Sequence, residues 1–295
     1  MKPGMKFNTV LCTILVTLLT SAPVLSHDPT KTNARDQWWW EDSWWDKGII
    51  KNVKSHKVKT QWISYKSGDN DIRSLVVRPA DSGKYPGILF VHGRRGLDDL
   101  IQAKVKRLAA RGLVVVAPDI YGSRFMDPYP YEHDYSIEDD VSRGVNVVLK
   151  RRDISGNKIC LVSHTRGGYY TLKAAVTKKQ QKKNVACYVS WYPHMQDPNA
   201  PEPSQVYGYA PEADDLKIPA LIFIGENEQY QRRRPIESAV KSLKQKKRPV
   251  TLVIYPGVGR GFDCRPEDVR TFADDLAAKD ANQRAARFIY KHLKQ

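Results

Sequence analysis

The segment KICLVSHTRGG, residues 158–168, decides the fold. After Lys158 the segment runs through apolar residues to Val162, which predicts a buried strand. Two adjacent glycines, Gly167 and Gly168, then open a segment with helical periodicity that continues to residue 177. A buried strand that passes through a tight turn directly into a helix is the building unit of a parallel α/β sheet.

The same alternation of strand and helix extends in both directions from this segment. Predicted buried strands are PGILFVH (86–92), LVVVA (113–117), VACYVSW (185–191), ALIFI (220–224) and VTLVIY (250–255). Predicted helices cover residues 97–111, 136–152, 167–177, 235–246 and 266–293, and a proline-rich loop covers residues 193–219. Residues 58–66 and 72–78 alternate apolar and polar side chains, which predicts an antiparallel hairpin at one edge. The pattern therefore predicts an α/β fold with a mostly parallel central sheet of about eight strands and helices on both faces.

Polar and glycine-rich loops follow five of these strands. They are HGRRGL (92–97), APDIYG (117–122), SHTRGG (163–168), IGENE (224–228) and YPGVGRGF (255–262). Loops at the carboxyl ends of parallel strands meet at one edge of the sheet, where α/β proteins place their binding and catalytic groups. The sequence therefore predicts a single cleft built from these loops.

In order and spacing, the five loops resemble those of the dienelactone hydrolase family within the α/β-hydrolase fold. The resemblance runs from about residue 58 to the C-terminus. It implies a hydrolase of small esters and lactones that uses a Cys or Ser nucleophile, an Asp and a His. In this sequence Thr165, Glu228 and Arg260 stand at those three positions. The oxyanion side of the cleft corresponds to Gly93, Arg94 and Arg166.

All three catalytic positions thus depart from the family pattern. A nucleophile on such a turn commonly adopts a positive φ, which a β-branched residue like Thr165 tolerates poorly. Arg260 cannot act as a general base because a guanidinium stays protonated at ordinary pH. We therefore expect a pseudoenzyme or binding protein. One alternative is an active ester or lactone hydrolase that uses Thr165 with His92 or His194 as base, although each of these is more often a hydrogen-bonded structural histidine.

Arginine is abundant on the cleft loops. The loops carry four arginines: Arg94, Arg95, Arg166 and Arg260. Their positive charge favours binding of an anion such as a carboxylate or phosphate. Alternatively, these arginines are solvated or paired with nearby acids. The expected ligand is a small ester, lactone or carboxylate. We expect no metal and no cofactor, because the sequence has neither metal-ligand spacing nor a nucleotide-binding loop.

Length and composition limit the class of protein. The chain has 295 residues, of which 41% are hydrophobic, and a formal net charge of +16. These values exclude a disordered polymer, a collagen and a multi-span membrane protein. Because no nucleic-acid motif accompanies the positive charge, an acidic partner or anionic surface is favoured over nucleic acid.

The N-terminus predicts export. Residues 1–26 contain two lysines, then an apolar run, and end in small or medium-sized residues, a pattern typical of a cleaved signal peptide. An uncleaved N-terminal anchor is the alternative. Cleavage would remove two lysines and no acid, so the net charge would fall from +16 to +14. We expect a periplasmic or secreted protein, with residues 57–295 forming the hydrolase-like domain and no transmembrane span after signal removal.

Residues 27–56 form a Trp-rich arm. Five tryptophans occur close together: Trp38, Trp39, Trp40, Trp44 and Trp45. The arm either packs onto the domain or docks a protein partner, a glycan or a membrane interface; docking a protein would suit an accessory subunit of an exported complex.

Cys160, Cys187 and Cys264 remain after the predicted cleavage, so at most one disulfide can form within the chain. Cys160 and Cys187 lie in apolar, strand-like segments, and we expect both to be buried free thiols.

Overall fold

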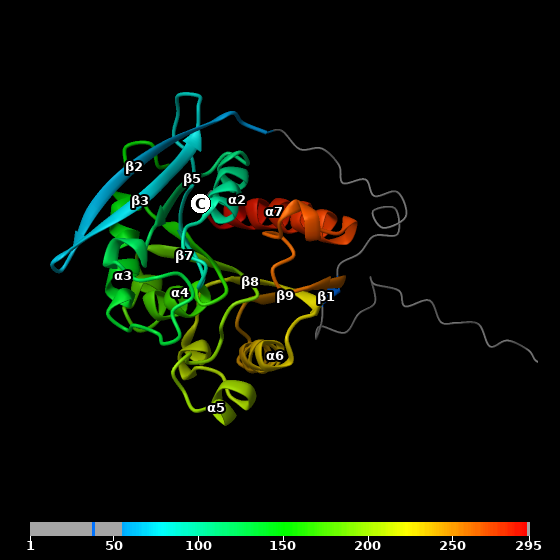
Figure 1. The fold of residues 1–295 in the computed structure, drawn as a ribbon. Helices are drawn as coiled ribbons and strands as arrows, with labels where there is room; N and C mark the ends of the chain where they lie inside the picture. Colours follow the sequence, from blue (N-terminus) through cyan, green and yellow to red (C-terminus); the bar gives the residue numbers. More distant parts are fainter. Residues whose placement is uncertain (1–36, 39–54, 294–295) are drawn as a thin grey trace, which may run out of the picture.

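A single sheet organises the computed structural model, which describes residues 37–38 and 55–293 (Figure 1). Within these residues the strand order is β1-β9-β8-β7-β6-β4-β5-β3-β2. The strands are β1 Gln37–Trp38, β2 Val58–Ser67, β3 Asn70–Pro79, β4 Gly87–Val91, β5 Val114–Pro118, β6 Ile159–His164, β7 Val185–Trp191, β8 Ala220–Asn227 and β9 Val250–Gly259. All pairings are parallel except those of β3 with β2 and with β5. The predicted fold and its edge hairpin are confirmed.

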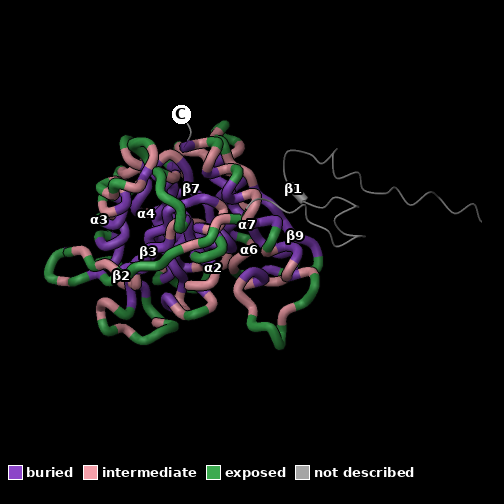
Figure 2. Tube along the Cα trace, turned by 90° about the horizontal axis from the view of Figure 1, so that it is seen from above, coloured by how far each residue is buried: buried purple, intermediate pink, exposed green. Residues whose placement is uncertain are grey.

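Helices cover both faces of the sheet. They are α2 Asp99–Ala109, α3 Ile137–Leu149, α4 Gly167–Ala175, α5 Glu202–Tyr207, α6 Tyr230–Gln245 and α7 Phe272–Leu293. Figure 1 shows α2 and α7 on one face and α3, α4 and α6 on the other. Every residue of β4 and β5 is buried as a result, which explains why these strands are continuous apolar runs rather than alternating ones. Exposed residues gather on β2 and the connecting loops (Figure 2).

The structure differs most from the predicted elements at α5, α6 and α7. Helix α6 begins at Tyr230 and contains Pro235, which was predicted to be its first residue. A proline this near the start removes only one helical hydrogen bond, so the helix can extend in front of it. Helix α5 lies inside the predicted loop 193–219. Helix α7 begins at Phe272, six residues later than predicted.

Cys160 and Cys187 form a disulfide, so the prediction of free thiols was wrong. The two residues are registered neighbours on the parallel strands β6 and β7, with their Cα atoms 4.7 Å apart. That separation suits a disulfide, and strand register decides it. Sequence shows that both strands are apolar but not which residues face each other. Cys264 is a free thiol and is half-buried.

Most of the N-terminal predictions lie outside the described residues. The signal peptide 1–26 and most of the Trp-rich arm 27–56 fall there. Of the arm's tryptophans, the structure places only the backbone of Trp38, which pairs with Ile254 where β1 runs parallel to β9. In the part of the chain that is described, no helix has the length and apolar character needed to cross a membrane.

The disulfide gives a first prediction. In the unfolded protein without reductant, thiol titration should find two fewer thiols than with reductant. Replacing both residues by alanine should lower the free energy of unfolding by about 3 kcal/mol, because the bond closes a loop across a sequence separation of 27 residues. Chemical denaturation would measure the loss. Equal thiol counts with and without reductant would contradict the bond.

Candidate active-site cleft

Thr165 occupies the tight turn between β6 and α4. Its φ is +45°, in the left-handed region that β-branched residues rarely adopt. Three backbone hydrogen bonds hold this turn. The Thr165 N–H donates to the Trp191 carbonyl at 3.1 Å, and the Thr165 carbonyl accepts from Gly168 at 2.9 Å and from His194 at 2.8 Å. The chain therefore keeps the strained geometry of a nucleophile turn, although a threonine stands on it.

Glycines allow this turn to pack closely against the neighbouring loop. A Cβ on Gly93 would lie only 1.6 Å from the Thr165 hydroxyl oxygen, so that hydroxyl points at the backbone of the HGRRGL turn. A Cβ on Gly167 would collide with the carbonyl oxygens of Val91 and His92. The start of α4 and the end of β4 therefore approach each other only because both positions lack a side chain.

Glu228 and Arg260, the residues predicted at the acid and base positions, form an ion pair. Arg260 Nη1 donates to Glu228 Oε1 at 3.0 Å, and the Gln229 N–H donates to the same oxygen at 2.9 Å. The Glu228 side chain is fully buried, and the Arg260 guanidinium lies over the ring of Tyr192. Two of the three predicted catalytic residues, Glu228 and Arg260, are therefore in contact. They interact as a carboxylate and a permanently charged guanidinium, not as an acid and a base. Neither partner can pass a proton to and from the Thr165 hydroxyl as an imidazole would.

His92, one of the two alternative bases, has both ring nitrogens committed. Nδ1 donates to the Gly93 carbonyl at 2.8 Å, and Nε2 accepts from the Ile120 N–H at 3.2 Å. A carbonyl can only accept and a peptide N–H can only donate, so these partners fix one neutral tautomer. His92 is fully buried and joins two cleft loops, which is a structural role.

His194, the second alternative base, lies in a strongly positive environment. Its backbone bonds to Thr165, and its side chain is buried. Burial lowers the pKa of His194 well below its ordinary value. Nearby cations lower that pKa further; in order of effect they are Arg232, Arg260, Arg166 and Arg94. A general base must become an imidazolium, and these charges oppose that step, so His194 is a poor base for Thr165.

Arg94 and Arg166 both hold the backbone of residues 129–132. Arg94 donates to the carbonyls of Tyr129 and Pro130. Arg166 donates from Nη1 to Pro130 and Glu132, and from Nη2 to Tyr131, at 2.7–3.0 Å. Much of their hydrogen-bonding capacity is thus used to fix this loop beside the cleft. Arg95, also predicted to bind an anion, pairs instead with Asp98 on its own loop at 2.6 Å.

Arg232 is a cleft residue that the sequence reasoning missed. It lies in the first turn of α6, four residues after Glu228. Its pKa is lowered to about 10, first by burial and then by the charges of Arg260, Arg166 and Arg94. In sequence it belongs to the run Arg232-Arg233-Arg234, which resembles an ordinary charged helix start. Its position directly after the IGENE loop was the signal that could have identified it.

Several nitrogens of this arginine group have no protein acceptor. Among the buried nitrogens that lack a hydrogen-bond partner in the described residues, four belong to these arginines and to His194: Arg166 Nε, Arg232 Nη1, Arg260 Nη2 and His194 Nδ1. Glu228 Oε2 is likewise without a partner in this part of the chain. Unpaired buried polar groups cost free energy, and unpaired cations cost more. The group therefore leaves several N–H donors without an acceptor and the Glu228 Oε2 acceptor without a donor.

A second polar cluster lies around His164, which immediately precedes Thr165. The His164 Nε2 atom is 3.2 Å from Asp263 Oδ2. The same carboxylate contacts Lys104 Nζ from helix α2 and accepts from the Tyr192 hydroxyl. Lys104 Nζ also lies 3.4 Å from the centre of the Trp191 ring. This buried network connects α2, β6 and the loop after β9, so it supports the loop that carries Arg260.

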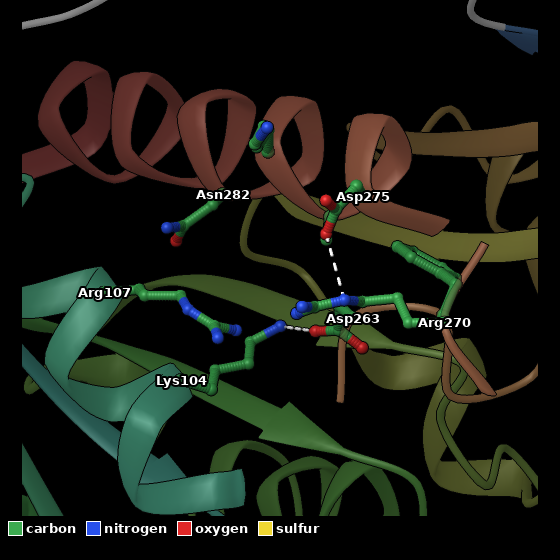
Figure 3. Close-up of a pocket in the computed structure, with 9 residues that line it drawn as sticks. Lys104, Arg107, Asp263, Arg270, Asp275 and Asn282 are labelled. Carbon is green, nitrogen blue, oxygen red and sulfur yellow. Dashed lines mark hydrogen bonds and ion pairs between the residues drawn. The ribbon is translucent and has the colours of Figure 1, made fainter. Parts of the chain in front are cut away.

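The cluster borders a pocket of about 300 Å³ beside α2 and α7 (Figure 3). Lys104 and Asp263 touch at its inner wall, and Arg270 pairs with Asp275 at its rim. Side-chain atoms of His164, Asp263 and Cys264 lie within 4.8 Å of one another, a donor set that suits zinc. Because Lys104 contacts the same carboxylate, a metal ion could bind there only after Lys104 moved away. We therefore assign this cluster a structural role.

Comparison with known proteins now identifies the family. The model of the dienelactone hydrolase family matches residues 72–293. The chain belongs to the dienelactone hydrolase family. The resemblance seen in the five loops is confirmed.

Similar proteins agree with this assignment. A Synechocystis sp. protein named "Putative carboxymethylenebutenolidase" is 21% identical over 252 residues, which cover 80% of this chain and 98% of the relative. A solved structure titled "Putative Dienelactone Hydrolase" from Klebsiella pneumoniae has a TM-score of 0.64 and 21% identity, and covers 81% of this chain and all of that one. An esterase from Pyrobaculum calidifontis has a TM-score of 0.58 at 20% identity, covering 80% of this chain and 86% of that one. At these identities the solved structures show the shared fold alone.

The buried network yields a second prediction. Lys104→Met should lower the free energy of unfolding by about 3–5 kcal/mol, because it leaves the Asp263 carboxylate buried without its cation. Adding Asp263→Asn should recover part of that loss, since the uncompensated charge is removed. Urea denaturation of both variants would measure these changes in the free energy of unfolding. Lys106→Met, at an exposed position of the same helix, is the matched control and should be nearly neutral. Equal stability of the Lys104 and Lys106 variants would contradict the pairing.

Proposed function

We propose that this member of the dienelactone hydrolase family does not hydrolyse esters by the family's triad and instead binds a small anion in the former active-site cleft. The observation that carries the proposal is the Arg260–Glu228 ion pair at 3.0 Å, which stands where the family has a base and its acid. A fixed cation at that point attracts an anion and cannot relay a proton.

The surrounding groups support the same proposal. Arg232, Arg166 and Arg94 add positive charge around His194, as the depressed pKa of His194 reflects. Buried guanidinium nitrogens that lack acceptors within the described chain would gain charge-assisted hydrogen bonds from a bound anion.

We further propose that the protein is exported to the periplasm or secreted. The signal-like residues 1–26 motivate this localisation. The Cys160–Cys187 disulfide supports it, because such bonds persist in oxidising compartments.

An active hydrolase with Thr165 as nucleophile is the competing function. It needs a base, and the two alternatives are a fully bonded His92 and a His194 whose basicity is opposed by four arginines. We therefore expect the full-length protein to hydrolyse p-nitrophenyl acetate and a small unsaturated lactone no faster than a Thr165→Ala variant does. The initial rates of hydrolysis of both proteins, measured spectrophotometrically, test this expectation. A rate above buffer that disappears in the variant would establish catalysis by Thr165 and overturn the proposal.

A gain-of-function variant tests the cause of the inactivity. Combining Thr165→Ser, Glu228→Asp and Arg260→His restores the residue types of the family pattern on an unchanged turn. Because a positioned general base contributes about 10²-fold or more, the triple variant should exceed the natural protein's ester hydrolysis by about that factor. The variant with Arg260→His omitted is the matched control and should remain inactive. Equal rates in the two variants would mean that the ion pair is not what prevents hydrolysis.

A further inference from the structure

We infer that the pocket beside α2 and α7 binds a small organic oxyanion, a molecule with a carboxylate or phosphate head group and a short apolar body. This site is separate from the cleft at Thr165, so the inference does not rest on the function proposed for that cleft. It follows from which side chains line the pocket and which of them already have partners (Figure 3).

Two helix faces and one connecting segment line this pocket, which has a volume of about 300 Å³. Lys104 and Arg107 lie three residues apart on α2, so they share a face of that helix. Four residues of α7 also share a face and line the pocket from that side: Asp275, Ala278, Lys279 and Asn282. Phe262, Asp263 and Arg270, which lie between β9 and α7, complete the lining. The volume is at the lower end of the range for small-molecule sites, so the pocket suits a small ligand.

The two carboxylates of the lining already have cations. Asp263 pairs with the buried Lys104, and Asp275 pairs with Arg270 at 3.2 Å. Figure 3 shows both pairs as dashed lines. A cationic ligand would therefore have to displace one of these partners, and the lining does not favour that class of ligand.

Three donor groups of the lining have no acceptor. Arg107 on α2 and Lys279 on α7 are exposed at the pocket, and neither has an ion pair or side-chain hydrogen bond with the residues that the structure describes. Asn282 forms no side-chain hydrogen bond with these residues either, and because its Oδ1 is buried, the polar atom that a ligand can reach is the Nδ2 donor. Arg107 and Asn282 extend into the space between the two helices (Figure 3). All three groups donate and two are charged, so an oxyanion is the ligand that satisfies them together.

The lining also has an apolar part, which Phe262 and Ala278 supply. A short hydrocarbon body would cover this surface while the head group accepts from the free donors, whereas a bare inorganic ion would contact the donors alone. We therefore expect an organic anion.

Isothermal titration calorimetry on the full-length protein tests the inference with three probes. Benzoate and phenyl phosphate carry the two head groups on an aromatic ring, and benzyl alcohol has a ring without a charge. We expect at least one of the two anions to bind about tenfold more tightly than benzyl alcohol, because a charge-assisted hydrogen bond contributes about that factor. The tighter of the two anions assigns the head group.

Arg107→Gln should weaken binding of the tighter anion by about 10- to 100-fold, because it removes a charged donor from the pocket. Lys106→Gln is the matched control, which should leave binding unchanged. Lys106 is the neighbouring residue on α2, is exposed and does not line the pocket, and its loss lowers the net charge equally. Both positions are exposed, so we expect both variants to fold, which circular dichroism verifies.

Ala278→Leu tests the pocket without a change of charge. Its larger side chain would fill part of the cavity and should weaken binding by at least about tenfold. Ala278 is half-buried on α7 and leucine is a good helix former, so we expect this variant to fold. Arg232→Gln, a change in the cleft, should leave binding at the pocket unchanged.

The outcomes separate this site from the cleft. Binding that Arg107→Gln and Ala278→Leu weaken, and Arg232→Gln does not, would support the pocket as a site of its own. Weakening by Arg232→Gln with no effect of Arg107→Gln would place the anion in the cleft, which overturns this inference and supports the function proposed above. Equal weakening by Arg107→Gln and Lys106→Gln would place the anion on the general positive surface and overturn the pocket site. Binding of benzyl alcohol as tight as that of the anions, or binding of no probe, would overturn it as well.

Discussion

The tight turn at Thr165 is the constraint on which the cleft depends. Its left-handed backbone is held by the carbonyl of Trp191 and by the N–H groups of Gly168 and His194. These bonds fix the end of β6, the start of α4 and the loop after β7 relative to one another. The missing side chain of Gly93 then lets the HGRRGL turn close over the Thr165 hydroxyl. The strained backbone of the turn is therefore held in place by its neighbours, and the departure from the family pattern expected from the sequence lies in the side chains.

Electrostatics determines what those side chains can do. A histidine at position 260 would take and release a proton, but a guanidinium holds its proton permanently. Its ion pair with Glu228 also removes the carboxylate that would orient a base. Arg166 and Arg232 add to the positive charge, and the neutral His194 lies among them. Under the proposed function, the arginine at position 260 would both remove the proton relay and supply a cation for the anion, so the two effects would have a single physical cause.

Sequence reasoning found the fold because it depends on local patterns, and it predicted the site from the positions of the loops. Buried parallel strands are continuous apolar runs, and their carboxyl-end loops can be identified by position. Arg232 was missed because nothing local distinguishes it from Arg233 and Arg234; only the direction of each side chain on α6 sends one of the three into the cleft. The disulfide was missed for a similar reason, since the register of β6 against β7 places Cys160 beside Cys187. Whether Arg94 and Arg95 can bind an anion also depends on their other partners. In the structure Arg94 donates to a backbone carbonyl, and Arg95 pairs with the carboxylate of Asp98.

By itself the sequence determined the α/β architecture and the family, and it predicted Thr165, Glu228 and Arg260 at the catalytic positions. These conclusions follow from periodicity and from the order of loops, which are properties of neighbouring residues. Only the tertiary structure decided that Glu228 and Arg260 form a pair, that His92 is fully bonded, and that Arg166 donates to the backbone of residues 130–132. Each of these depends on contacts between residues far apart in the chain, because a side chain's remaining hydrogen-bonding capacity is known only once all its partners are in place.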